Sequence, residues 1–180
     1  VLRESDRLNA TISSFLAYAR PGRVDVTRVD ARRPVQDTAA LLKNSPETSE
    51  HHVIDVVVPA TPVWLDADEH QLRQIVWNLA HNALKHNGDA AGPLELRAGK
   101  LPPTQRPYLE VIDRGQGIPE ALAERIFEPF VTGESRGTGL GLFLARELAQ
   151  ANGATLIFEP RPGGGSVFRL VFSDPLRWRA

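Results

Sequence analysis

The chain has 180 residues, enough for one domain or for one domain and a fragment of another. Its 21 Lys and Arg residues nearly balance its 22 Asp and Glu residues, and this near-neutral charge argues against a dedicated nucleic-acid-binding protein and against a polybasic membrane-surface module. The absence of cysteine excludes disulfides, thiolate metal sites and a cysteine nucleophile, and no apolar run reaches the roughly 20 residues that a membrane span needs.

The first predicted element is a helix over Val1–Ala19, in which apolar residues recur at helical spacing and which Pro21 and Gly22 end. A lone amphipathic helix cannot bury its apolar stripe, so we expect a partner helix upstream or on another subunit. The chain contains no methionine, even at position 1, which predicts that it begins inside a longer gene product or was processed. A domain boundary is expected near Arg20–Val24.

The remainder of the chain alternates between strand and helix patterns. Period-two alternation and β-branched runs predict strands over Val24–Val29, His52–Val58, Val63–Leu65, Leu94–Arg97, Tyr108–Ile112, Ala154–Phe158 and Ser166–Phe172. Apolar residues three and four apart predict helices over 34–43, Asp68–His86, 119–127 and Gly141–Ala151. The last two strands are expected to form an antiparallel pair. Together these elements predict a mixed sheet with helices on one face, an α/β sandwich.

A polar stripe runs along the predicted helix Asp68–His86. Asn78, Asn82, Lys85 and His86 share one side of it, because a helix turns by about 100° per residue. Asn carbonyls are oxygen ligands for Mg²⁺, and a Lys ammonium supplies a positive charge for phosphate. The stripe therefore indicates either a metal–phosphate site or a solvated polar face, and the weak helix propensity of Asn favours a specific role.

A glycine-rich turn follows the predicted strand Tyr108–Ile112. It begins with Asp113, and Gly115 and Gly117 alternate after it, which suggests close approach of the backbone to a ligand. A carboxylate only accepts hydrogen bonds, so Asp113 suits an amino-group donor such as the exocyclic nitrogen of adenine. The alternative is a plain glycine-rich turn capped by an aspartate.

A second glycine-rich stretch, residues 137–141, opens the predicted helix Gly141–Ala151. Such an entry binds phosphate through backbone N–H groups and the helix dipole. The stretch is neither a dinucleotide fingerprint nor a P-loop, because no strand closely precedes it and no lysine follows it. It is therefore a weak signal when taken alone.

A segment between the two glycine-rich stretches contains Phe127 and Phe130, followed by residues 132–136. Glycines flank this segment, so it is able to close over a bound nucleotide. We expect Phe127 and Phe130 to pin it to the core by burial. The alternative is a plain loop with two core aromatics.

Taken in order and spacing, these motifs resemble the nucleotide-binding domain of the gyrase, Hsp90, histidine kinase and MutL superfamily over about residues 24–172. Residues 1–20 resemble the end of the second dimerisation helix of histidine kinases, and the segment that ends at Leu142 is similar to the nitrogen-regulation and type IV pilus sensor kinases. The matching boxes are the N box at 78–85, the G1 box at 113–117, the F box at 127–130 and the G2 box at 137–141.

The resemblance implies a Bergerat-type ATP-binding fold, an α/β sandwich whose mixed sheet is mostly antiparallel. It also implies three regions: 1–22 as the end of the dimerisation helix, 23–175 as the catalytic ATP-binding domain and 176–180 as a tail. A protein-histidine kinase would transfer the γ-phosphate of ATP to a His on the dimerisation domain, for relay to an Asp of a response regulator. The alternatives are an ATPase-type conformational clamp of the same superfamily and a non-catalytic nucleotide-sensing module.

The resemblance also implies roles for single residues. Asn82 would bind Mg²⁺ with help from Asn78, Lys85 would contact the triphosphate, and these three form the catalytic set. Asp113 would accept a hydrogen bond from the adenine amino group. The residues implied to contact ATP are Asn82, Lys85, His86, Asp113, Gly115, Gly117, Ile118, Phe130, Arg136, Gly137, Thr138, Gly139, Leu140 and Gly141. His86 departs from the family, which usually has Phe or Tyr there.

Position 78 favours a kinase over an ATPase. The ATP-hydrolysing branches place a Glu four residues before the metal-binding Asn, as a base for water, whereas this chain has Asn78 there. A carboxamide accepts no proton at neutral pH, so water is poorly activated and the γ-phosphate persists until a better nucleophile arrives.

The expected partners are this protein's own dimerisation domain and a receiver domain, with no nucleic acid. None of the five histidines, His51, His52, His70, His81 and His86, has the sequence context of the family's phosphoacceptor, so we expect the acceptor to lie outside this chain. The family implies a cytoplasmic domain of a homodimeric protein, with membrane attachment of the full-length protein.

Overall fold

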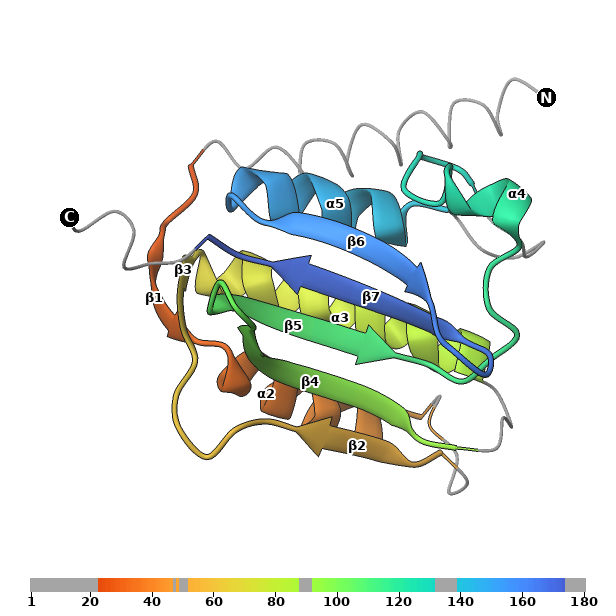
Figure 1. Ribbon diagram of the computed structural model, residues 1–180, viewed down its shortest axis with the longest axis horizontal. Coiled ribbons are helices and arrows are strands. Elements are labelled where there is room, and N and C mark those ends of the chain that lie inside the picture. Colours follow the sequence, from red (N-terminus) through yellow and green to blue (C-terminus); the bar gives the residue numbers. More distant parts are fainter. Residues whose placement is uncertain (1–22, 47, 49–51, 88–91, 132–138, 174–180) are drawn as a thin grey trace.

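The computed structural model describes residues 23–46, 48, 52–87, 92–131 and 139–173 (Figure 1). The predicted helix over Val1–Ala19 and the tail over 176–180 lie outside the described residues. No helix in the described ranges combines the length and hydropathy of a membrane span.

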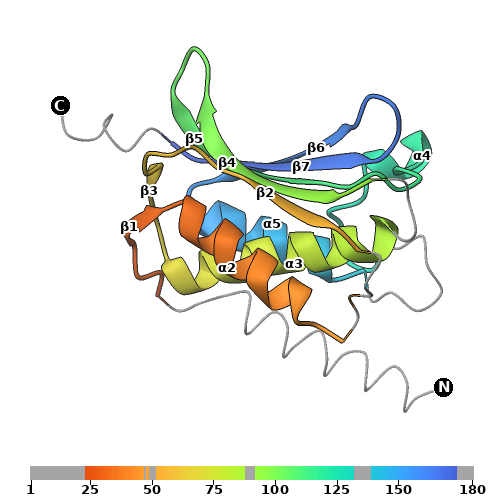
Figure 2. The ribbon, with the colours of Figure 1, turned by 90° about the horizontal axis from the view of Figure 1, so that it is seen from below.

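A five-stranded sheet forms one layer of the protein. Its order is β2 (Ile54–Val57), β4 (Leu94–Leu101), β5 (Arg106–Ile112), β7 (Ser166–Val171) and β6 (Thr155–Pro160). The pair β2–β4 is parallel and the other three pairs are antiparallel. Figure 2 shows α2 (Arg32–Lys43), α3 (Glu69–Asn87) and α5 (Gly141–Ala151) packed on one face of this sheet. The predicted mixed, mostly antiparallel α/β sandwich is confirmed.

Two short strands lie apart from the main sheet. β1 (Thr27–Asp30) and β3 (Trp64–Ala67) pair only with each other in the described chain. The predicted strand Val24–Val29 begins too early, because the observed strand starts at Thr27. Val29 is buried, whereas Val26 is 56% exposed and has no neighbouring strand to pair with. The predicted helix over 119–127 is reduced to one turn, α4 (Glu120–Ala123).

Side-chain alternation in β4 separates the two faces of the main sheet. Leu94, Leu96 and Ala98 are buried in the hydrophobic core under the helices. Glu95 and Arg97 point to the opposite face and form an ion pair there. Period-two alternation thus gives one apolar and one charged face, as a half-covered sheet requires.

A buried polar network fixes the N-terminal end of α3. The side chain of Asn152, just after α5, donates to Gln71 Oε1 at 2.8 Å and accepts from the N–H of Asp68 at 2.8 Å. Asp68 in turn caps α3, because its Oδ1 accepts from the N–H of Gln71 at 3.1 Å. These bonds tie the start of α3 to the end of α5.

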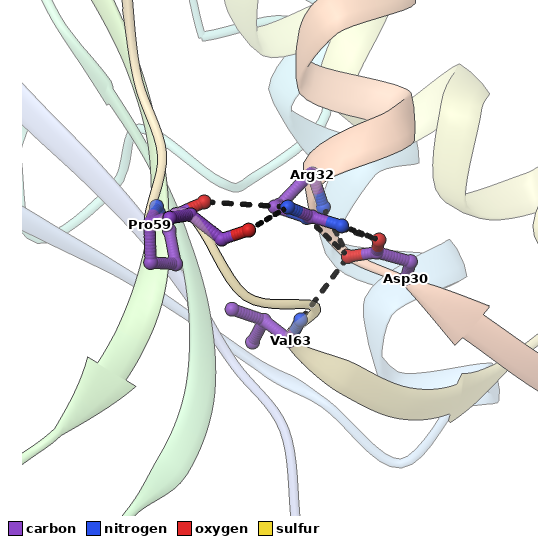
Figure 3. A network of polar contacts seen from close by, with 5 residues as sticks. Asp30, Arg32, Pro59 and Val63 are labelled. Atoms are coloured by element: carbon purple, nitrogen blue, oxygen red, sulfur yellow. Dashed lines mark hydrogen bonds and ion pairs between the residues drawn. The ribbon is translucent and has the colours of Figure 1, made fainter.

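A second network joins β1, α2 and the turn before β3 (Figure 3). Asp30 accepts hydrogen bonds from the Arg32 guanidinium, with Nη2 at 2.9 Å from Oδ2, and from the N–H of Val63 at 3.1 Å. Arg32 Nη1 donates to the carbonyl of Ala60 at 2.8 Å. Burial opposes ionisation of Asp30, but the hydrogen bonds from Arg32 and Val63 outweigh it, so its pKa lies below the ordinary value of 3.8.

We expect Asp30→Asn to lower the free energy of unfolding at pH 7 by about 2 kcal/mol, since it removes hydrogen bonds to a charged acceptor. A lowered carboxyl pKa stabilises the fold above pH 3.8, and this stabilisation is lost as pH falls through the folded-state pKa. Urea unfolding between pH 2 and pH 7 measures the effect. Asp66→Asn, at an exposed position in β3, is the matched control. An equal loss in both variants would contradict the prediction.

Candidate functional site

The predicted polar stripe lies on the C-terminal half of α3. Asn78 and Asn82 are half-buried, whereas Lys85 and His86 are exposed. The Nδ2 of Asn78 is buried and makes no hydrogen bond within the described chain. Buried amide groups are nearly always paired, so an unpaired one is a position where a ligand or water has a place. A fully solvated polar face therefore does not describe this stripe.

Asp113 lies directly after β5, deep in the protein. Its side chain is 2% exposed and its Oδ1 accepts a hydrogen bond from the N–H of Gly115 at 3.0 Å. Burial raises the pKa of this carboxyl, and the hydrogen bond from the N–H of Gly115 and the electrostatic interaction with His86 offset the rise only in part. A buried carboxylate with a raised pKa is typical of functional sites.

The structure brings the stripe and Asp113 together by direct backbone contact. A Cβ atom added to Gly115 would lie 2.1 Å from the carbonyl oxygen of His86, so only glycine permits this approach. The side chain of the next residue, Asn87, accepts a hydrogen bond from the N–H of Arg114 at 2.7 Å. The end of α3 and the loop after β5 therefore form one surface.

A third segment reaches this surface that the sequence analysis did not select. The turn between β6 and β7 contains Gly163, Gly164 and Gly165, all with positive φ. A Cβ atom on Gly165 would lie 2.1 Å from the carbonyl oxygen of Asp113. Gly117 lies against the same turn, with an added Cβ at 3.4 Å from Gly165 O. Three consecutive glycines between two strands were the available signal.

Phe130 and Gly139 meet at the entrance to α5. The N–H of Phe130 donates to the carbonyl of Gly139 at 3.1 Å, and a Cβ added to Gly139 would lie 2.7 Å from Phe130 Cα. The prediction that Phe130 is buried was wrong, because the side chain is 43% exposed and only the backbone is held. Phe127 is half-buried and packs edge-on against Phe168, with ring centroids 6.2 Å apart.

Three further predicted contact residues lie within the described chain. Ile118 is partly buried against the core and Leu140 is buried. Gly141 begins α5, and a Cβ added there would meet no atom within 4 Å. The remaining three, Arg136, Gly137 and Thr138, lie outside the described residues.

No group of three or more His, Asp or Glu side chains in the described ranges is arranged to hold a metal ion. Such groups do not include carboxamide oxygens, like those of Asn78 and Asn82, which also bind metal ions. Carboxamide oxygens suit Mg²⁺, which keeps several waters and binds few protein groups together with phosphate.

The model of the histidine kinase-, DNA gyrase B- and HSP90-like ATPase family matches residues 67–176, which include α3, Asp113 and α5. The chain belongs to this family. The family resemblance drawn from the four boxes is thereby confirmed.

Individual relatives agree with the family. The sensor protein kinase PilS of Pseudomonas aeruginosa is 34% identical over 178 residues, which cover 96% of this chain and 32% of PilS. The catalytic domain of histidine kinase ThkA superimposes with a TM-score of 0.71 at 25% identity, covering 82% of this chain and 95% of that one. Full-length ShkA, solved with AMPPNP, gives 0.71 at 32% identity, covering 95% of this chain and 37% of ShkA. The chain thus spans about a third of the length of the curated relatives that it matches.

The glycine contacts predict opposite results for two similar substitutions. Gly115→Ala forces a methyl group against the His86 carbonyl, so we expect a loss of about 1–3 kcal/mol in the free energy of unfolding. Gly141→Ala meets open space at the start of a helix, so we expect a change within about 0.5 kcal/mol. Urea unfolding of both variants measures this. A Gly115→Ala variant as stable as Gly141→Ala would disprove the close contact.

Proposed function

We propose that this chain is the ATP-binding catalytic domain of a sensor histidine kinase. The observation that carries the proposal is the joining of the polar stripe of α3 to the buried carboxylate of Asp113 through the contact of Gly115 with His86. The names of PilS and ThkA support it, as does the nucleotide analogue bound by ShkA.

Asp113 is the group that recognises the adenine. Its carboxylate accepts a hydrogen bond from the exocyclic amino group, and guanine offers a carbonyl oxygen in place of that donor. Its burial excludes competing water, so the bond is stronger than it would be in solvent. Gly115, Gly117 and Gly139 let neighbouring backbone segments pack closely around the nucleotide site. Ile118, Phe130 and Leu140 supply apolar contact.

Asn82, Asn78 and Lys85 hold the phosphate end. Asn82 offers a carbonyl oxygen to Mg²⁺, and the unpaired Nδ2 of Asn78 fits a water or phosphate oxygen beside it. Bound Mg²⁺ neutralises charge on the phosphates. Lys85 is exposed on the same helix face and contacts the triphosphate as a point charge. His86 lies next to Asp113 and contacts the nucleoside, and Arg136, Gly137, Thr138 and Gly141 complete the phosphate contacts.

The chemistry is an in-line phosphoryl transfer. The bond between the γ-phosphorus of ATP and its bridging oxygen breaks and ADP leaves, while a bond forms to an imidazole nitrogen of the acceptor His, which loses its proton to solvent. Positioning and charge stabilisation supply most of the rate. Asn78 cannot take a proton from water, which suppresses hydrolysis.

The wider assignments belong to the same proposal. The acceptor His lies on the dimerisation domain, residues 1–22 end that domain, and 23–175 form the catalytic domain. An Asp of a response regulator receives the phosphoryl group in the second step. The full-length protein is a homodimer attached to the membrane, with this domain in the cytoplasm, and it binds no nucleic acid.

Asp113→Asn separates recognition from folding. The raised pKa of Asp113 means that the folded state resists ionisation, so this group costs stability as pH rises from 3.8 through its folded-state pKa. At pH 7 we expect the variant to be at least as stable as wild type and to bind an ATP analogue about 10–100-fold more weakly. Calorimetric titration and thermal unfolding test both. Unchanged affinity would contradict the adenine assignment.

Asn82→Ala tests the phosphate end. With the acceptor domain added, we expect phosphoryl transfer to fall by about 100-fold or more, because a charge-positioning group is lost at the reacting phosphate. Transfer of ³²P from labelled ATP is the measurement, and full activity of the variant would refute the assignment. Steady ATP hydrolysis by wild type that survives Asn78→Ala would instead favour the ATPase clamp.

A further inference from the structure

The last residue of α3, Asn87, lies where two segments of the candidate site meet the start of β4. Its side chain is 4% exposed. Its Oδ1 accepts from the N–H of Arg114 at 2.7 Å, and its Nδ2 donates to the carbonyl of Gly92 at 3.3 Å. Arg114 directly follows Asp113, and Gly92 lies just before β4. One carboxamide therefore joins α3, the loop after β5 and the start of β4.

The two bonds of Asn87 require a carboxamide of this length. One partner is a backbone donor and the other a backbone acceptor, so the side chain must both accept and donate. A carboxylate accepts but does not donate when ionised, and an alkyl side chain does neither. Both partners are main-chain groups, so the bonds locate the backbone itself.

A second contact acts on the same two segments. The backbone of Gly115 packs against the carbonyl of His86, the residue before Asn87. Arg114, whose N–H bonds to Asn87, also pairs through Nη2 with Glu95 of β4 at 3.2 Å. The loop that carries Asp113 is thus held to the end of α3 and to β4.

We infer that Asn87 is a positioning residue that sets the separation between the phosphate-binding stripe of α3 and the adenine-binding Asp113, without contacting the nucleotide. This inference rests on the proposed function, in which one ATP molecule touches both parts. A ligand that contacts two parts of a site binds with full affinity only when both parts are held in the geometry that its bound conformation needs, even when each part is intact. Asn87 therefore controls affinity for the whole nucleotide.

The test compares two buried carboxamides at opposite ends of α3. α3 has 19 residues, so at about 1.5 Å per residue Asn152, at its N-terminal end, lies roughly 27 Å from Asn87. We expect both Asn87→Ala and Asn152→Ala to lower the melting temperature. Only Asn87→Ala should weaken binding of AMP-PNP with Mg²⁺, by about tenfold, in calorimetric titrations well below both melting temperatures.

A second readout needs no nucleotide. The amide hydrogen of Arg114 is bonded to Asn87, so its exchange with solvent deuterium should be faster in Asn87→Ala and unchanged in Asn152→Ala. Asn87→Asp keeps the acceptor and should keep Arg114 protected while losing the bond to Gly92, with an intermediate affinity. If Asn87→Ala does not fold, Asn87→Asp takes its place in the titrations.

The outcomes separate the inference from the proposed function. Equal affinity in the folded Asn87 variant and in Asn152→Ala overturns the inference and leaves the proposed function standing. Unchanged exchange at Arg114 in Asn87→Ala also overturns it. If the wild-type chain binds no AMP-PNP, the proposed function fails and the inference fails with it.

Discussion

The packing of the Gly115 backbone against the carbonyl of His86 governs the arrangement of the candidate site. It joins a helix that carries carboxamides and a lysine to a loop that carries a buried carboxylate. The contact is possible because Gly115 has no Cβ, and Gly165 makes a similarly close approach on the other side of Asp113. These two backbone contacts hold the main chain on both sides of Asp113, so they set where the loop after β5 lies relative to α3.

Local sequence patterns predicted those features that depend on neighbouring residues. The helix Gly141–Ala151 agrees at both ends, because its apolar spacing is regular and Asn152 and Gly153 end it. The stripe of α3 was found because helical spacing alone places Asn78 and Asn82 on one side.

Local sequence patterns could not predict features that depend on residues far apart in the chain. The hydrogen bond from the N–H of Arg114 to Asn87 joins residues 27 positions apart, and neither local sequence indicates it. Val26 alternates correctly but meets no partner strand, so it is exposed. Phe130 is an aromatic residue, which suggests burial, yet its positive φ and its bond to Gly139 hold the side chain outward.

The candidate site is also where the fold gives up stability. Asp113 is buried although burial disfavours its charge, and Asn78 holds a buried amide nitrogen without a hydrogen bond in the described chain. By contrast, Asn152 is buried with its side chain bonded to Gln71 and Asp68, at the opposite end of α3. Polar groups that lack a partner in the free protein are already in place for a ligand. Functional sites commonly lower the stability of the fold in this way.

The charged face of the main sheet has a consequence for association. Arg169 of β7 pairs with Glu110 of β5 at 2.6 Å and with Glu159 of β6 at 3.3 Å, beside the pair of Glu95 and Arg97. A half-covered sheet with an apolar outer face would stack on a second sheet. Here stacking would strip water from ordered ion pairs, which costs more than their attraction returns. The ion pairs on the face opposite the helices therefore disfavour stacking of a second sheet over them (Figure 2).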